Sequence, residues 1–139
     1  MRWAIVLNAW WGSFRIGELL SKNRHTYCPK NSLLASDVTF NENSVSFWLR
    51  SPKIERQKTG DVVEVWNIPS RADLDPVLVL KAFSEKREEK FGKAMSTPMF
   101  IHEDGAIYTK LEFNSDLAYL LSKYPELNTT REKDEKLIH

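Results

Sequence analysis

Cysteine is almost absent from this chain: Cys28 is the only one among 139 residues, so no disulfide can form within it. The spacing of His25 and Cys28 suits two metal ligands, but no second pair follows. Because structural zinc takes about four ligands, we interpret them as loop residues and expect no metal site.

Long apolar runs are lacking too. The stretch WAIVLNAWW is interrupted by Asn8 and falls short of the roughly 20 residues that cross a bilayer.

An excess of charge of either sign is also lacking, since 20 Lys and Arg residues are balanced by 19 Asp and Glu residues. The net charge of +1 gives no broad signature of nucleic-acid binding, so any anion site must be local. The N-terminal stretch has no basic run beyond Arg2 and no small-residue cleavage site of a secretory signal. Together with the single cysteine, these features predict an intracellular protein that does not contact a membrane.

What is present is the composition of one globular domain, with 42% hydrophobic and 28% charged residues. The apolar period changes along the chain from helical to alternating and back, which predicts an α+β domain with helices packed around a small sheet. The expected elements are helices over about 2–11, 14–21, 74–91 and 109–124 and a three-stranded antiparallel sheet over about 36–67.

Capping residues predict where the helices begin and end. Gly12 can end the first helix, whose apolar residues run all round it, and Ser13 is a good N-cap for the second. Asp73 or Asp75 can cap the third helix, with Pro76 in its first turn. The mixed-charge tail of that helix, SEKREEKFGK, is expected to be solvated. The segment TPMFIHEDG is expected to be extended and to close on a turn before the last, amphipathic helix.

Three β-rich runs predict the strands: SDVTF, SVSFWLR and DVVEVWNI, with NEN as the turn between the first two. Alternation in the third run places Val63 and Val65 on the face opposite Val62, Glu64 and Trp66. The second and third runs are joined by the polar, basic segment SPKIERQKTG. The large aromatic residues are expected in the core: Trp10, Trp11, Phe14, Trp48 and Trp66. The apolar positions expected on the last helix are Leu111, Leu117, Leu120 and Leu121.

One arginine does not fit its surroundings, the apolar stretch AWWGSFRIGELL. Burying the guanidinium of Arg15 is unfavourable unless it is paired or kept for an anion. Glu18 lies three positions on, on the same side of a helix. From these residues alone, an exposed Arg15–Glu18 pair worth about 0.3–0.5 kcal/mol is the simpler interpretation.

The order of these features resembles the catalytic domain of tyrosine recombinases, the phage-integrase family. The family's first arginine box, roughly G-x-R-x-x-E-L, is similar to GSFRIGEL at residues 12–19, with one extra residue after the glycine. LLASDVTF resembles the stretch before the family's first strand, and LRSPKIERQKTGDVVEV resembles its lysine-bearing hairpin. PMFIHEDGAIYTKLEFNSDLAYLL resembles the segment before its second box. The style is closest to the integrases of DIRS-like and Crypton elements.

The resemblance implies DNA cleavage and rejoining without a metal or other cofactor: a tyrosine attacks a phosphate, a phosphotyrosyl bond forms and a 5′-hydroxyl leaves. Arg15 would bind two phosphate oxygens with its planar fork, supported by Glu18. Lys53, which follows Ser-Pro at the end of the second strand, would protonate the leaving oxygen, with Lys58 as the alternative. His139 would be the first residue of the second box, H-x-x-R.

The rest of the family's site, including the second arginine and the nucleophilic tyrosine, has no counterpart in these 139 residues. The resemblance therefore implies the N-terminal half of a catalytic domain that binds DNA in its full-length context and is inactive alone. The alternative is a non-catalytic, recombinase-derived interaction or DNA-binding domain. We expect Arg15 to lie in a pocket facing the 51–60 hairpin, and the chain to self-associate through exposed apolar surface. We expect no small-molecule substrate. The location would be the nucleus for a eukaryotic element and otherwise the cytoplasm.

Overall fold

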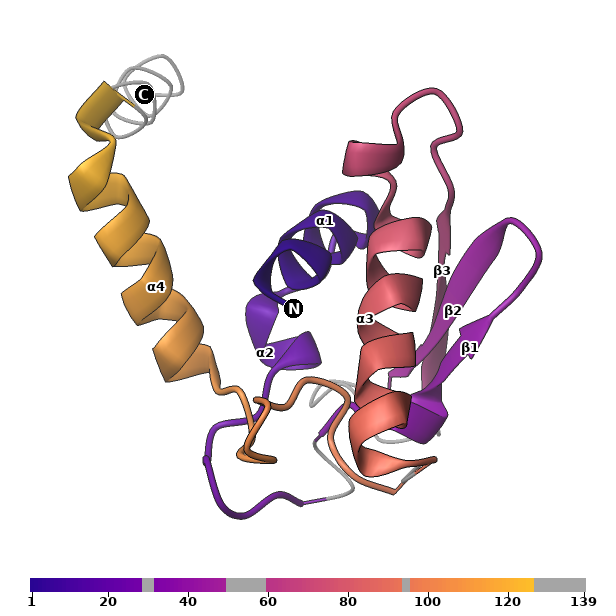
Figure 1. The fold of residues 1–139 in the computed structure, drawn as a ribbon, viewed down its shortest axis with the longest axis horizontal. Coiled ribbons are helices and arrows are strands. Elements are labelled where there is room, and N and C mark those ends of the chain that lie inside the picture. The colour runs from indigo at the N-terminus through magenta and orange to yellow at the C-terminus, as the bar shows by residue number, and fades with distance from the viewer. Residues whose placement is uncertain (29–31, 50–59, 94–95, 127–139) are drawn as a thin grey trace.

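The computed structural model describes residues 1–28, 32–49, 60–93 and 96–126, which form an α+β domain as predicted. A small sheet lies beside α1 and α3, and α4 extends away from them (Figure 1). The elements are, in chain order, α1 (Arg2–Gly12), α2 (Ile16–Leu19), η1 (Ala35–Asp37), β1 (Val38–Phe40), β2 (Ser44–Leu49), β3 (Asp61–Trp66), η2 (Ala72–Leu74), α3 (Pro76–Phe91) and α4 (Lys110–Lys123).

The sheet is antiparallel throughout, with the strand order β1-β2-β3. Val45 pairs with Val65, and both are buried in the core against which α1 and α3 pack. On the other face of β3, Val62 is 62% and Trp66 is 61% exposed. The predicted alternation along this strand is confirmed. The expectation that Trp66 belongs to the core is wrong, because it lies on the sheet face turned away from the core.

Helix α1 packs one side on α3 and β3 and exposes the other side to solvent. Ala4 and Ile5 are fully buried, whereas Trp3, Trp10 and Trp11 are exposed. The prediction of a helix buried all round, with Trp10 and Trp11 in the core, is therefore wrong. A helix in the outer layer of a two-layer domain has only one face in contact with the core, whatever its composition.

A left-handed residue separates α1 from α2. Ser13 has φ 54° and ψ 36°, and its backbone N–H bonds to the last turn of α1, so it ends that helix and does not cap the next one. Gly12 allows a close approach, because a Cβ there would lie 2.3 Å from the ring of Phe14. The Phe14 ring packs edge-on against Phe47 of β2, with centroids 4.9 Å apart. The second helix is shorter than predicted because this turn takes up its first residues.

Helix α3 begins as predicted. The Asp75 carboxylate accepts hydrogen bonds from the backbone N–H groups of Val77 and Leu78 at 2.9 and 3.4 Å, and Pro76 lies in the first turn. The mixed-charge end of the helix departs from its expected solvation at one position, since Arg87 is buried.

The segment 97–109 before α4 folds back on itself at a turn, as predicted. Leu34 forms an antiparallel bridge with Pro98, and Ile101 forms one with Ile107. Gly105 occupies the intervening turn with φ 88°, a conformation that favours glycine. The fold-back places the start of α4 beside the chain that leaves α2.

Helix α4 begins with a capping box. The Thr109 hydroxyl accepts a bond from the Glu112 N–H at 3.2 Å, and the Glu112 carboxylate accepts one from the Thr109 N–H at 3.0 Å. Of the fourteen residues of α4, all of them described, only Phe113 is buried. The predicted helix is confirmed, while its leucines remain largely uncovered by the described structure.

In the described ranges, no helix is long and apolar enough to cross a membrane.

Candidate functional site

Arg15 occupies the N-cap of α2, with an extended backbone and an exposed side chain. Its backbone N–H donates a 2.7 Å hydrogen bond to Oε1 of Glu18. Within the part of the chain that the structure describes, the guanidinium takes part in no hydrogen bond or ion pair. Glu18 therefore supports the backbone of Arg15 and not its guanidinium. Among the described residues, no partner orients the guanidinium.

The other predicted site residues, Lys53, Lys58 and His139, lie outside the described residues, so the structure does not place them. The two ends of the lysine-bearing connection are placed, because Leu49 at the end of β2 pairs with Asp61 at the start of β3.

Phe14, the residue before Arg15, packs on the strand that leads into this connection. Its ring packs on Phe47, which lies two residues before the end of β2 at Leu49. Arg15 follows Phe14 directly in the chain. The residue before Arg15 is therefore anchored on β2, two positions before that strand ends.

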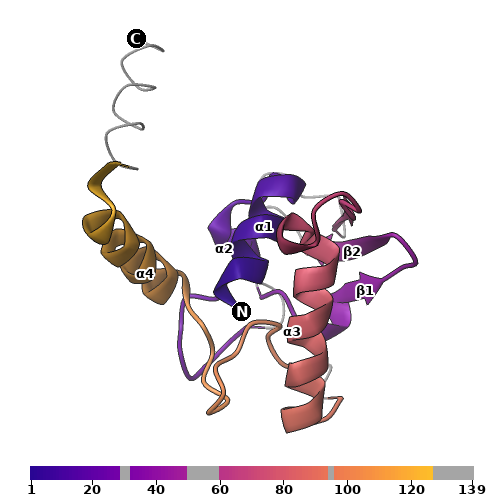
Figure 2. The ribbon, with the colours of Figure 1, turned by 45° about the horizontal axis from the view of Figure 1, so that its top comes forward.

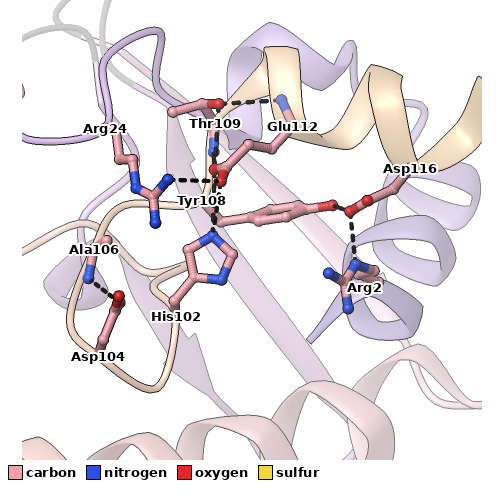
Figure 3. Close-up of polar contacts among 9 residues, drawn as sticks. All are labelled: Arg2, Arg24, His102, Asp104, Ala106, Tyr108, Thr109, Glu112 and Asp116. Carbon is pink, nitrogen blue, oxygen red and sulfur yellow. Dashed lines mark hydrogen bonds and ion pairs between the residues drawn. The ribbon is translucent and has the colours of Figure 1, made fainter.

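A network of charged and polar side chains ties the first turns of α4 to the rest of the domain (Figure 3). In its first half, Oδ2 of Asp116 accepts hydrogen bonds from the Tyr108 hydroxyl and, at 2.7 Å, from Nε of Arg2. The Arg2 guanidinium also lies over the Tyr108 ring, 5.6 Å from its centroid. These contacts join the start of α1 to α4.

Glu112 is the centre of the second half of the network. Its carboxylate oxygens lie 3.1 and 3.3 Å from Nε2 of His102, and one of them lies 3.9 Å from Nη1 of Arg24. The His102 ring packs edge-on against Tyr108, with centroids 5.2 Å apart. Figure 3 shows Arg24 and His102 approaching Glu112 from different segments. The contact between the His102 and Tyr108 rings therefore joins the two halves of the network.

The network favours ionised carboxylates. Hydrogen bonds from Tyr108 and Arg2 lower the pKa of Asp116. Burial raises the pKa of Glu112, but bonds from the Thr109 N–H and His102 outweigh it and leave that pKa below its usual value. Burial, followed by the bond to Asp116, raises the pKa of Tyr108 to about 12. Both effects favour the protonated form of the Tyr108 hydroxyl, which makes it harder to activate as a nucleophile than an ordinary tyrosine.

A cavity of about 560 Å³ lies between the loop after α2, the end of α3 and the turn before α4. Arg24, His25 and Asp104 contribute charged or polar groups to its walls, and Phe91 and Ile101 contribute apolar surface. Arg15 does not line this cavity. The predicted pocket around Arg15 faces the 51–60 connection, of which residues 51–59 lie outside the described residues, so it stays a prediction.

Arg87 is a buried arginine that the sequence analysis missed. Its Nε donates to the backbone carbonyl of Met99 at 3.1 Å, and its Nη2 donates to the carbonyl of Pro98 at 3.0 Å and to the hydroxyl of Thr97. Burial lowers the pKa of its guanidinium. The available signal was helical spacing, since Arg87 comes seven residues after the buried Leu80. Charged neighbours in sequence concealed that signal.

Comparison with known proteins finds no match among family models, curated proteins or solved structures. Function is therefore inferred from the residues and their geometry. Among the described residues, no group of three or more His, Cys, Asp and Glu side chains is arranged to hold a metal ion.

Proposed function

We propose that this chain is the arginine-bearing half of a tyrosine-recombinase-type catalytic domain and binds DNA through a phosphate held by Arg15. The observation that carries the proposal is the turn before α2, where an unpaired arginine follows a left-handed residue by two positions. Its other support is the order of elements, with a three-stranded antiparallel sheet between the arginine-bearing turn and two further helices.

The turn removes an irregularity in the resemblance to the recombinase box G-x-R-x-x-E-L. In that box the glycine precedes the arginine by two residues, and the residue two before Arg15 is Ser13. Ser13 is the one non-glycine residue with positive φ in the described ranges, at φ 54°. Because glycine adopts this conformation most readily, Ser13 and not Gly12 matches the family's glycine. The box then needs no extra residue.

The state of the Arg15 side chain also supports phosphate binding. A guanidinium that is exposed and unpaired keeps all five donors for a ligand, and its planar fork suits two phosphate oxygens. Its backbone is held by Glu18 at 2.7 Å and by the packing of Phe14 on β2. Lys53 or Lys58, in the connection between β2 and β3, is the proposed second contact to the same phosphate.

The binding test compares wild type with Arg15→Ala on labelled duplex DNA over a range of salt concentrations. We expect Arg15→Ala to weaken binding about tenfold and to reduce the salt slope by about one, as for the loss of one phosphate contact. Arg71→Ala is the matched control, because Arg71 is also exposed but is paired with Asp73. Equal binding by wild type, the Arg15 variant and the control would refute a phosphate role for Arg15.

The cleavage test asks whether these 139 residues form a covalent bond to DNA. We expect no adduct with supercoiled plasmid or nicked suicide substrates, because the chain contains no H-x-x-R box and the hydroxyl of Tyr108 is bonded to Asp116. A phosphotyrosyl adduct mapped to any tyrosine of this chain would contradict the proposal that it is inactive alone.

A further inference from the structure

Helix α4 carries an apolar stripe that begins in the core and continues beyond it. We define the α4 stripe as Phe113, Leu117, Leu120, Leu121 and Tyr124. Their spacing of four, three, one and three residues keeps them on one face of a helix. Phe113 is buried, but Leu117 is 40% exposed, and Leu120 and Tyr124 are each 45% exposed. Figures 1 and 2 both show α4 extending away from the body that α1, α3 and the sheet form.

A second apolar stripe lies on the body itself. Trp3, Val6 and Trp10 follow one another at intervals of three and four residues along α1, and we call them the α1 stripe. All three are exposed, Trp10 at 76%. They lie on the side of α1 opposite the fully buried Ala4 and Ile5. After Arg2, α1 has no charged residue of its own within the stripe, and Nε1 of Trp3 donates a 2.8 Å hydrogen bond to the backbone carbonyl of Asp73 in η2.

The two stripes, together with the residues that flank them, offer apolar surface of the order that a stable dimer needs. An aromatic side chain carries about 150–250 Å², so the two stripes together expose several hundred Å² of apolar surface. Patches of a few hundred Å² mark interaction sites, and a stable interface buries roughly 800 Å² on each partner. Both stripes used together, with the residues that flank them, reach that order of area, whereas either stripe alone falls short of it.

We propose that two copies of this chain form a dimer in which the α4 stripe of each copy packs on the α1 stripe of the other. A two-fold arrangement uses each stripe once per copy and leaves neither uncovered. Polar contacts of Asp116 with Arg2 and Tyr108 fix the first turns of α4 to the body. The rest of the helix projects from the body with its stripe exposed. This proposal does not rest on the recombinase function and goes beyond it.

The first test measures molar mass by light scattering after size exclusion, from low micromolar to near-millimolar protein. We expect a monomer–dimer equilibrium for wild type and at least an about tenfold rise in the dimer Kd for Leu117→Glu/Leu120→Glu, because the interface would bury two carboxylates. The matched control is Leu111→Glu, in the same helix but off the stripe and 74% exposed. It should dimerise like wild type.

The second test applies the same kind of comparison to the α1 stripe, with another exposed tryptophan as the control. Trp10→Lys should raise the dimer Kd as strongly, whereas Trp66→Lys, at another exposed tryptophan on the outer sheet face, should not. Circular dichroism of every variant checks that each one folds. All five substituted positions are at least 40% exposed, so the substitutions introduce no charge into the core of the monomer.

Mixing the two disruptive variants distinguishes an α4–α1 contact from an α4–α4 contact. In the proposed dimer, a Leu117→Glu/Leu120→Glu copy and a Trp10→Lys copy make one wild-type contact and one contact between opposite charges. We therefore expect the mixture to recover a heterodimer that neither variant forms alone. A wild-type monomer at all concentrations, loss of the dimer in the control variants, or a mixture that stays monomeric would each overturn the proposal.

Discussion

The carboxylate of Glu18 lies 2.7 Å from the backbone nitrogen of Arg15, so the two residues have different roles despite their helical spacing. Glu18 satisfies a backbone donor at the start of α2, a helix of only four residues that has few hydrogen bonds of its own. The Arg15 guanidinium is left in solvent. The two side chains can therefore be removed independently, and the consequences should differ.

Glu18→Ala should destabilise the fold, by about 0.5–1.5 kcal/mol, because it removes the acceptor that caps α2. Arg15→Ala should change the free energy of unfolding by less than about 0.5 kcal/mol, as for an exposed side chain without a partner. Glu18→Gln is the control, since an amide oxygen can accept the same bond. Urea denaturation measures all three. Equal destabilisation by Arg15→Ala and Glu18→Ala would show that the guanidinium has a structural partner after all.

Ser13→Gly should stabilise the protein, because Ser13 holds φ 54°, where a side chain is disfavoured. Part of the relief is offset by the greater freedom of glycine in the unfolded chain, so we expect a net gain of about 0.5–1 kcal/mol. Ser115→Gly, at an exposed position inside α4, should instead lose about the same amount. A loss of stability in both glycine variants on thermal denaturation would contradict a left-handed conformation at Ser13.

Arg87→Met should lower the free energy of unfolding by about 2–4 kcal/mol, because it leaves buried carbonyl groups of Pro98 and Met99 without their donor. Arg87→Lys should recover only part of this loss, since an ammonium lacks the planar fork. The control is Lys86→Met, one residue away and exposed. Chemical denaturation of the three variants decides the matter: an Arg87→Met protein as stable as the Lys86 variant would mean that this arginine is dispensable.

At acid pH we expect the contacts at the start of α4 to weaken, because two carboxylates there become protonated. Asp116 and Glu112 have folded-state pKa values below their usual ones, so each stabilises the fold at neutral pH. That contribution is complete above about pH 5, just above the unfolded-state pKa values, and is lost as the pH falls through the lower folded-state values. Asp116→Asn should reduce the slope of stability against pH in this range, measured by urea denaturation at successive pH values. An unchanged slope would indicate that the Tyr108–Asp116–Arg2 contacts do not form in solution.

Local signals in the sequence determined most of the secondary structure. The alternation along β3, the cap at Asp75 and the amphipathic pattern of residues 109–124 each depend on neighbours within a few residues, and each prediction is confirmed. The same local pattern misjudged the start of α2. Whether Ser13 caps a helix or ends one depends on where Phe14 packs, and Phe14 packs on Phe47 of β2, far along the chain.

Burial was decided by the tertiary structure. Composition alone suggested that Trp10, Trp11 and Trp66 lie inside and that Arg87 lies outside, and the reverse holds for all four. The number of helices and strands limits how many faces can be covered, so large apolar side chains remain in solvent when their face has no neighbour. An arginine can be buried when a nearby segment supplies carbonyl acceptors. The sequence by itself therefore determined which elements form, while long-range packing decided which of their faces meet solvent and left the Arg15 side chain unpaired.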